Sequence, residues 1–498
     1  MLTNSAGFLY SAMPRASCLF SVGAAATLFL HSCITVGPDY EDPNLLVADE
    51  WDSLGGSTAV PDYWTDRLSA DQSAKRTGAE LWWRQFNDSS LNKLITHART
   101  SHPTAAAADA RIREARAQRN VLAAAWSPWI GTRNEVQMGE NNPSTFGGTT
   151  GSSFSTNFIS GLEAGWEVDL FGGTRRGVEA ATAEWQAAVE WQRDALVVLS
   201  AEVALQYIAT RTLEERLARA TEAVADFRKL HEVLSQRQDE GLTPEADVVE
   251  SKAQLLTREA RLPKLEQEMK VARIRLANSS GIYPNALAGL LEKNTGIPVP
   301  PRKILVAMPA DALRNRPDVR REERKLAAQT ARIGLAESEL YPKLAISGAL
   351  SWESTSISDL FTQANRAFGF GPKLRWRIFE GCKIQNRVAE EEARTDIRLA
   401  AYQQQVLDAV AEIEIALTRL DTEQRYAAAQ TAAAEEHLKS TKLTRESYLA
   451  GLVDIRRLLN SLMDYHDARD EEAAALGRRA GFAAALFKSI GGGQIPDA

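Results

Sequence analysis

The feature that most constrains this chain is a long, uninterrupted helical pattern in its middle. From Thr174 to about Asp239, apolar or small residues recur mostly every three or four positions, with no proline and a single glycine at position 177. This spacing places them on one face of an α-helix. At 1.5 Å per residue the helix would be roughly 100 Å long. That length implies coiled-coil packing, and a second helix is expected to return over residues 245–278.

Two segments in front of the long helix have the pattern of strands. Residues 154–170 alternate apolar and polar side chains, which is typical of a strand with one apolar face, and residues 129–138 form a second candidate. The segment between them is rich in Gly, Ser, Thr and Asn and is interpreted as a loop. A helix is expected over 88–126, broken near Pro103 and stopped by Pro128.

The same succession of elements occurs a second time. Asp-Leu-Phe-Gly-Gly at 169–173 corresponds to Arg-Ile-Phe-Glu-Gly at 377–381, and Gly241 corresponds to Gly451. The chain therefore contains a duplicated unit of helix, two strands, long helix and return helix. The second copy is expected to contain a helix over 318–339, strands over 343–352 and 368–378, a long helix over 384–448 and a return helix over 454–487.

Four strands per chain limit the fold further. A membrane-spanning helix needs about 20 consecutive apolar residues, and no apolar run after residue 33 reaches that length, so a helical transporter is excluded. Short alternating strands fit a membrane β-barrel, but even small barrels need about eight strands. The chain must then oligomerise, and three copies would supply twelve strands. The expected fold is mainly α with a small β part and is internally duplicated, with four strands per chain that further copies must complete.

The first residues are interpreted as a targeting segment. Residues 16–30 form an apolar run that is too short to cross a bilayer and fits the core of a signal peptide. The run ends in Leu-His-Ser-Cys, which resembles the bacterial lipobox, so Cys33 is expected to carry lipid. The alternative is an ordinary secretory signal with a chance cysteine, and Met13 is an alternative start to Met1. With Cys33 blocked, Cys382 would be the only free thiol of the mature chain.

These patterns divide the chain into six segments. The expected segments are a lipoprotein signal peptide at 1–32, an N-terminal arm at 33–80, a first repeat at 81–280, a crossing linker at 281–317, a second repeat at 318–487 and a flexible tail at 488–498.

No catalytic or cofactor-binding pattern is present in the sequence. The six histidines form no HisxxHis or HisxxxHis pair, and CysxxCys is absent, so no metal site is expected. The glycine-rich stretches lack the strand-to-helix context of a phosphate loop. A formal charge of −7 does not call for nucleic acid as a partner. The chain is therefore not expected to be an enzyme or to hold a cofactor.

Three motifs resemble one known family, the outer-membrane efflux factors or TolC-like channels, and within it the lipoprotein branch that includes OprM and NodT. The most specific motif opens the second repeat with Arg316, Pro317 and Asp318. Trp82-Trp83 and Trp-Glu-Val-Asp-Leu-Phe-Gly at 166–172 resemble two further signatures. Glu322 and Ser89 depart from the family's usual Ala and Pro.

The resemblance implies a homotrimer. Its twelve strands would form a barrel in outer-membrane lipid, and its helices would form a periplasmic tube. A periplasmic adaptor, or membrane fusion protein, would join the helical tip to an inner-membrane pump, often of the resistance-nodulation-division type. The implied function is a passive exit duct for efflux, with lipid anchoring at Cys33. A duct for type I protein secretion and a structural coiled-coil envelope lipoprotein are the alternatives, and the exported substrate is not readable.

The resemblance also implies a gate at the helical tip. Gly241 and Gly451 sit at the two turns, where the adaptor would dock, although glycine is also favoured there for turn geometry alone. Asp239 and Tyr448 match a pair that holds the tip closed in relatives. The alternative for that pair is two solvated side chains near a turn.

Relatives narrow the pore with an apolar ring and an acidic ring further along the return helix. The matching positions are Arg456 and Asn460, which lie four residues apart and share a helix face. Neither fits the family pattern. Three Arg456 side chains would make a positive constriction, unless they simply face solvent. Asp454 is a weaker candidate for the acidic group.

Overall fold

The computed structural model describes residues 35–43, 51, 81–141, 153–291, 296–301, 304 and 309–492. Its helices are α3 (Ser89–Ser101), α4 (Pro103–Ala123), α5 (Gly173–Asp239), α6 (Glu245–Ser279), α7 (Pro309–Arg314), α8 (Pro317–Ser338), α9 (Lys383–Leu449) and α10 (Ile455–Ser489). Its strands are β1 (Trp129–Asn141), β2 (Ser153–Val168), β3 (Lys343–Ser354) and β4 (Arg366–Arg375). Short 3-10 helices are η2 (Trp82–Phe86), η3 (Ala124–Trp126), η4 (Leu287–Gly289), η5 (Ile357–Asp359) and η6 (Gln363–Asn365).

The helical duplication expected from the sequence is confirmed in detail. The long helices α5 and α9 each have 67 residues, and the return helices α6 and α10 each have 35. The break at Pro103 is also present, because the preceding residue His102 is extended (ψ 137°) and Pro103 opens α4. Local signals therefore define the helix ends within a residue or two.

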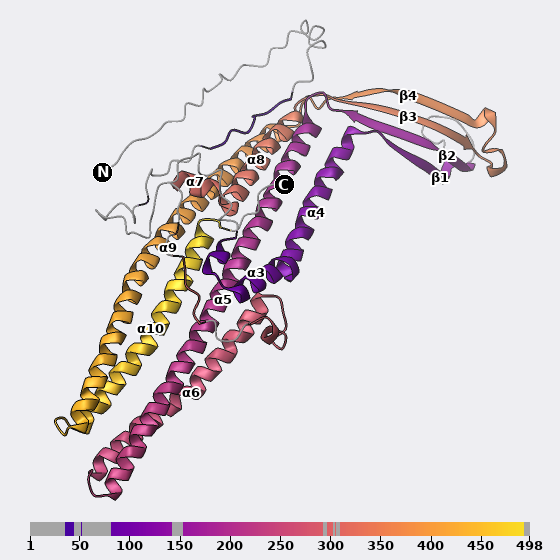
Figure 1. Cartoon of the computed structure of the whole chain (residues 1–498). Coiled ribbons are helices and arrows are strands. Elements are labelled where there is room, and N and C mark those ends of the chain that lie inside the picture. The colour runs from indigo at the N-terminus through magenta and orange to yellow at the C-terminus, as the bar shows by residue number, and fades with distance from the viewer. Residues whose placement is uncertain are drawn as a thin grey trace.

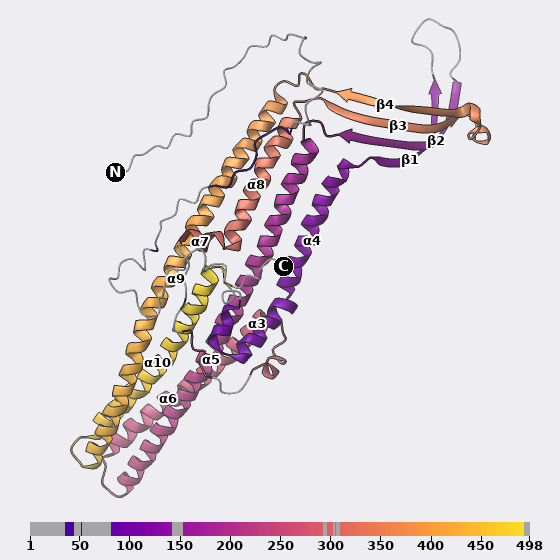
Figure 2. The same ribbon diagram turned by 45° about the horizontal axis from the view of Figure 1, so that its top comes forward.

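The helices form one elongated bundle with the sheet at one end (Figures 1 and 2). Along the half near the sheet, α4, α5, α8 and α9 follow one another side by side, since α5 packs on both α4 and α8, and α8 packs on α9. Along the other half, the hairpins α5–α6 and α9–α10 lie together through contacts of α10 with α5. The end away from the sheet, where both hairpins turn, is called the tip.

The four strands form one antiparallel sheet in the order β1-β2-β3-β4. The register places Val136 opposite Phe158, and Leu162 opposite Leu350, which is itself opposite Phe368. Because directly paired residues share a face and neighbours along a strand alternate, one face is largely apolar. Its large apolar side chains are Ile130, Val136, Met138, Phe154, Phe158, Leu162, Trp166, Val168, Leu344, Ile346, Leu350, Trp352, Phe368, Phe370 and Leu374.

The opposite face of the sheet is polar. Trp129 and Ile159 are its large apolar exceptions, and the Trp129 ring covers Gly165 on the paired strand. The ionisable side chains on this face are Arg133, Glu135, Glu163, Glu167, Lys343, Glu353, Lys373 and Arg375. The sheet thus separates an apolar surface from a charged one.

Two strands end earlier than the alternation predicted. β2 stops at Val168 instead of 170, and β4 spans 366–375 instead of 368–378. The partner strand β3 begins at Lys343, directly after Pro342, so residues beyond Arg375 have no ladder to join. The Trp376 indole instead donates a hydrogen bond to the Leu340 carbonyl at 2.9 Å.

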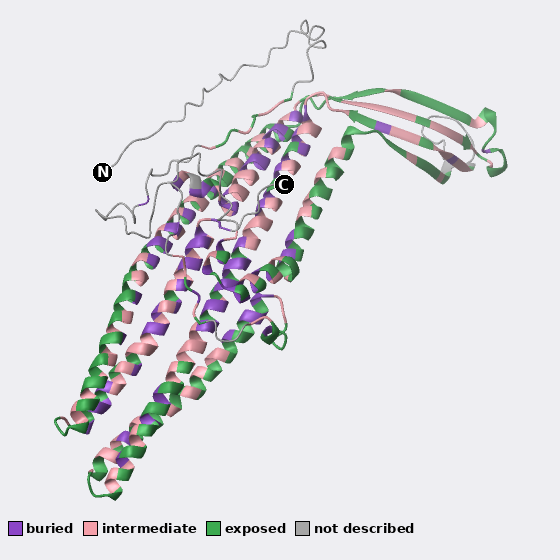
Figure 3. Cartoon of the chain, viewed as in Figure 1, coloured by how far each residue is buried: buried purple, intermediate pink, exposed green. Residues whose placement is uncertain are grey.

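The main core lies in the middle of the bundle, and exposed residues dominate the outer strands β1 and β4 and the tip (Figure 3). Trp82 is fully buried and its ring stacks on Phe487 at 5.2 Å between centroids, with Phe86 at the edge of both rings. Helix α10 continues to Ser489, and Gly492 N–H donates to the Phe487 carbonyl. Residues 488–492 are therefore packed, which corrects the expected flexible tail for that part.

One helix departs from the expectation that nothing after residue 33 is apolar enough to cross a membrane. Helix α5 contains an 18-residue window with a mean hydropathy of 1.3, and 56% of that window is buried inside the protein. Burial against α6, α8 and α10 accounts for this apolar stretch without a membrane.

Candidate functional site

A short N-terminal strap, residues 35–43, packs on the row of helices α4, α5, α8 and α9, which we call the helical wall. The buried Arg176 of α5 donates hydrogen bonds to the Val36 carbonyl at 3.0 Å, the Gly37 carbonyl at 2.9 Å and the Asp39 carboxylate at 2.8 Å. Burial alone would lower the pKa of Arg176, but the carboxylates of Glu179 and Asp39 outweigh it and raise the pKa. Arg176 therefore stays charged and clamps the strap.

Two glycines let the strap approach α8 closely. Gly37 has φ +88°, and a Cβ there would collide with the backbone of Gly334 in α8. A Cβ on Gly334 would lie 2.8 Å from both the Val36 carbonyl oxygen and Arg176 Nε. The strap thus sits in backbone contact with the wall, and sequence reasoning did not identify this clamp because its partners are about 140 and 300 residues apart.

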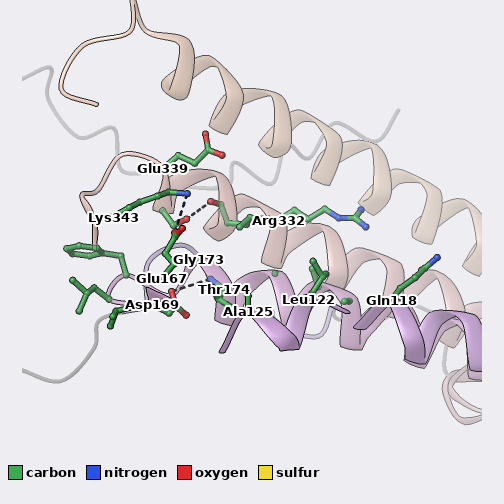
Figure 4. Close-up of a pocket in the computed structure, with 18 of the residues that line it drawn as sticks. Gln118, Leu122, Ala125, Glu167, Asp169, Gly173, Thr174, Arg332, Glu339 and Lys343 are labelled. Atoms are coloured by element: carbon green, nitrogen blue, oxygen red, sulfur yellow. Dashed lines mark hydrogen bonds and ion pairs between the residues drawn. The ribbon is translucent and has the colours of Figure 1, made fainter. Parts of the chain in front are cut away.

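A groove lies between α4 and α8, with α5 as its floor (Figure 4). Its cavity measures about 400 Å³. Glu167 and Lys343 of the polar sheet face line its end, and their ion pair measures 3.6 Å. The groove therefore adjoins the polar face of the sheet at Glu167 and Lys343, and no described residue of the strap lines it.

The three motif residues that open the second repeat form a buried ionic joint. Arg316 pairs with Asp318 at 2.7 Å and with Glu412 of α9 at 2.6 Å. Arg316 also donates to the Ser489 carbonyl, and Lys488 pairs with Glu412 at 3.0 Å. Pro317 supplies the first residue of α8, where its missing N–H costs no hydrogen bond.

Electrostatics hold this joint in its charged form. Burial would raise the pKa of Asp318, but Arg316 outweighs that effect and lowers it. Likewise burial would lower the pKa of Arg316, and the carboxylates of Asp318 and Glu412 raise it instead. The motif therefore ties the start of α8 to α9 and to the end of α10, which is a structural role.

The two turns at the tip have the same backbone geometry. Gly241 has φ +69° and Gly451 has φ +74°, and in both turns the next residue donates to a carbonyl five residues earlier: Leu242 to Arg237 and Leu452 to Ser447. This is the Schellman ending of a helix, which requires the left-handed conformation that glycine adopts freely. An added Cβ at either glycine would meet no atom within 4 Å, so conformation and not space requires glycine.

The structure does not bring Asp239 and Tyr448 together within one chain. Asp239 is exposed, and no hydrogen bond joins it to Tyr448 among the described residues of this single chain. The Tyr448 ring instead lies under the Arg237 guanidinium, 5.6 Å from the ring centroid, and packs on the tip core around Leu234.

The remaining tip residues lie at the start of α10. Asp454 is the N-cap of this helix and its carboxylate accepts a hydrogen bond from Arg457 N–H at 2.9 Å. Arg456 is 66% exposed and pairs with Glu250 of α6 at 3.5 Å, and Asn460 is exposed one turn further on. The Glu250 partner was not predicted, because nothing in the local sequence relates α6 to α10.

A buried histidine between α5 and α10 was also missed. His466 Nε2 lies 3.1 Å from the Asp226 carboxylate, and its ring packs beside Phe227. Burial lowers the pKa of His466, while Asp226 opposes that shift. No cluster of three or more potential metal ligands is found among the described residues, and Cys33 lies outside them.

The family model described as "Outer membrane efflux protein" matches residues 94–282 and 308–492, one match for each repeat. Nodulation protein T of Rhizobium leguminosarum bv. viciae is 26% identical over 481 residues, covering 95% of this chain and 94% of that protein. The "Probable outer membrane lipoprotein SilC" of Salmonella typhimurium is 24% identical, covering 94% and 98% respectively.

Solved structures agree with this relationship. The outer-membrane channel OprN superposes with a TM-score of 0.82 and 29% identity, covering 92% of this chain and 99% of that one. The resemblance read from the Arg316–Asp318 motif and the fold class are thereby confirmed. With both repeats matched, a sheet at one end and a helical tip at the other, this chain belongs to the family of outer membrane efflux proteins.

Proposed function

We propose that three copies of this chain form a passive exit duct through the outer membrane, closed at its helical tip until an adaptor and an inner-membrane pump engage it. The pump supplies the energy and the duct supplies the path. Membership of the outer membrane efflux protein family supports the assignment to efflux and not to an envelope tether.

The observation that carries this proposal is the open, two-faced sheet. Strands β1 and β4 are its outer strands and pair with nothing on their free edges among the described residues. Unpaired backbone groups are not tolerated in a bilayer, so each free edge requires a partner. Pairing β1 of one copy with β4 of the next satisfies both edges and closes a ring, with the apolar face toward lipid and the charged face inside.

The helical wall has matching free edges. Val121 on α4 is 73% exposed, and Ile397 and Leu407 on α9 are 67% and 63% exposed. Helices α4 and α9 are the two outer members of the α4-α5-α8-α9 row. Contact of α4 with α9 of the next copy would bury these side chains and continue the ring below the strands, which supports a homotrimer.

We place the gate at the tip. Because Asp239 and Tyr448 do not meet within one chain, the proposed latch is a hydrogen bond between neighbouring copies. Such a half-exposed bond contributes about 1 kcal/mol, so three of them would shift an opening equilibrium roughly a hundredfold. Gly241 and Gly451 would present bare turns to the adaptor.

We also propose that Cys33 carries the lipid anchor. Thr35 lies against Gly172 at the junction of helices and sheet, which is the level at which the proposed barrel meets the inner leaflet. The lipoprotein name of the SilC relative supports this anchor. Cys33→Ala should abolish acyl labelling in cells, and continued labelling of this variant would exclude Cys33 as the lipidated residue.

Planar-bilayer recording of the purified protein tests the duct. We expect discrete conductance steps, with Tyr448→Phe raising the open probability and leaving ion selectivity unchanged. Absence of any conductance from correctly folded trimers would contradict the exit-duct proposal. Wild-type behaviour of Tyr448→Phe would contradict only the latch.

A further inference from the structure

The groove between α4 and α8 is not explained by the packing of the wall. Its two walls carry Leu122 from α4 and Leu335 from α8, which are 47% and 40% exposed although both are apolar. Its floor on α5 is made of small residues. At Gly177 an added Cβ would meet no atom within 4 Å, so the space above the floor is open.

The groove has the size and lining of a small-molecule site. Its volume of about 400 Å³ falls in the range of ligand pockets, which combine apolar walls with a few polar groups. A second cavity of about 650 Å³ extends it along α5 and shares Ala115, Gln118, Glu184 and Arg332 with it.

The charge of the groove near the sheet is negative. Four carboxylates line it, from Glu167, Asp169, Glu184 and Glu339, against two cations, from Arg332 and Lys343. Most of these groups are visible in Figure 4, where Lys343 faces Glu167.

Two of the four carboxylates have close hydrogen-bonding partners, and the other two do not. Glu184 is held by Arg332 at 2.9 Å, and Asp169 accepts hydrogen bonds from the first N–H groups of α5. Glu167 and Glu339, in contrast, have their cations at 3.6 and 3.9 Å, beyond the 2.7–2.9 Å of a charge-assisted hydrogen bond. Their charge is the part available to a ligand.

The adjoining cavity adds three cations and one further carboxylate, Glu114. One of the cations, Arg111, stacks on the Trp191 ring at 4.4 Å from its centroid. Arg321 pairs with Asp194 at 2.9 Å, and Lys325 pairs with Glu322 at 2.9 Å. Neither Asp194 nor Glu322 lines that cavity, so Arg321 and Lys325 are already paired with carboxylates outside it.

We infer that the groove binds amphiphilic organic cations, with the apolar body of the ligand between Leu122 and Leu335 and its charge near Glu167 and Glu339. This rests on the proposed function for its biological meaning, since the groove lies on the polar side of the wall that would face the duct. There it acts as a resting site for solutes that pass from the helical tube into the strand barrel.

Binding is measured with the purified protein in lipid nanodiscs, with empty nanodiscs as the control for membrane partition. The probes are rhodamine 6G, a lipophilic cation, and fluorescein, an anion built on the same ring system. We expect saturable binding of rhodamine 6G, seen as increased fluorescence anisotropy, and weaker binding of fluorescein. Equal or tighter binding of fluorescein would overturn the charge assignment.

Three variants locate the site. Glu167→Gln combined with Glu339→Gln should weaken rhodamine 6G binding about three- to tenfold, as expected for charge contacts of one exposed and one half-buried carboxylate. Gly177→Leu adds a side chain to the floor of the groove, where its Cβ meets no atom within 4 Å, and should abolish binding. Glu163→Gln removes a charge from the same sheet face outside the groove and should leave binding unchanged.

The controls separate this inference from the duct itself. Each variant is also recorded in planar bilayers. If Gly177→Leu or the double Gln variant binds rhodamine 6G like the wild type while conducting normally, the groove inference is wrong and the duct proposal stands. If the wild type does not conduct, the proposed function fails, whatever the probe does.

Discussion

Replacing Arg176 by Gln should release the N-terminal strap while leaving the helical wall folded. The Arg176 side chain is 4% exposed and donates to the Val36 and Gly37 carbonyls. Its third partner, Asp39, is 89% exposed, so that contact contributes little. Two buried bonds from a charged donor contribute about 1.5–3 kcal/mol each, which gives about 3 kcal/mol as the lower estimate for the clamp.

Hydrogen exchange at Val36 measures this loss directly. The Val36 amide donates to the Phe171 carbonyl at 3.2 Å, so its exchange reports opening of the strap. A loss of about 3 kcal/mol corresponds to roughly a hundredfold faster exchange, since each 1.36 kcal/mol is a factor of ten. Amides within α5 and α8 should keep their protection.

The neighbouring Arg175 provides a matched control. Its guanidinium and backbone N–H donate hydrogen bonds to the Asp169 carboxylate. Arg175→Gln should therefore leave Val36 exchange within a few-fold of the wild type. Unchanged protection of Val36 in Arg176→Gln would refute the clamp and would mean that the other contacts of the strap hold it in place.

Three further outcomes are expected. Arg316→Met should lower the thermal unfolding midpoint seen by circular dichroism, because it leaves the mostly buried carboxylate of Asp318 without its guanidinium partner at about 3–5 kcal/mol, while Glu412 keeps its ion pair with Lys488; an unchanged midpoint would contradict this. His466 lies near Asp226, Glu222 and Arg258, and burial lowers its pKa. The histidine of the unfolded chain therefore takes up a proton at a higher pH than the histidine of the folded chain, so the free energy of unfolding should fall as pH drops below about 6.5. His466→Leu should remove that pH-dependent part of the melting curve, and an identical pH profile would exclude the histidine as its source. Arg456→Glu should shift the ion selectivity of the channel toward cations. Adding Glu250→Arg should restore the ion pair between the two positions and the conductance of the wild-type channel, and unaltered selectivity of Arg456→Glu would place Arg456 outside the pore.

Short-range signals in the sequence determined the secondary structure of this protein. The three- and four-residue spacing in α5 and the left-handed glycines at Gly241 and Gly451 act through the backbone of neighbouring residues, so they can be read locally. The duplication indicated that the chain has four strands. Four strands are too few to close a barrel, so further copies of the chain are needed. The motif at Arg316–Asp318 identified the family but not the ionic joint that it builds.

The tertiary structure alone decided which residues meet across the bundle. Arg176 with the strap, Arg456 with Glu250, and His466 with Asp226 join segments separated by 137 or more residues. Strand ends likewise depended on where the partner strand began, as at Arg375. The groove exists only because α4 and α8 flank the same helix. Periodicity specifies which face of an element is buried, but the partner that buries it is chosen by packing over the whole chain, and no local pattern encodes that choice.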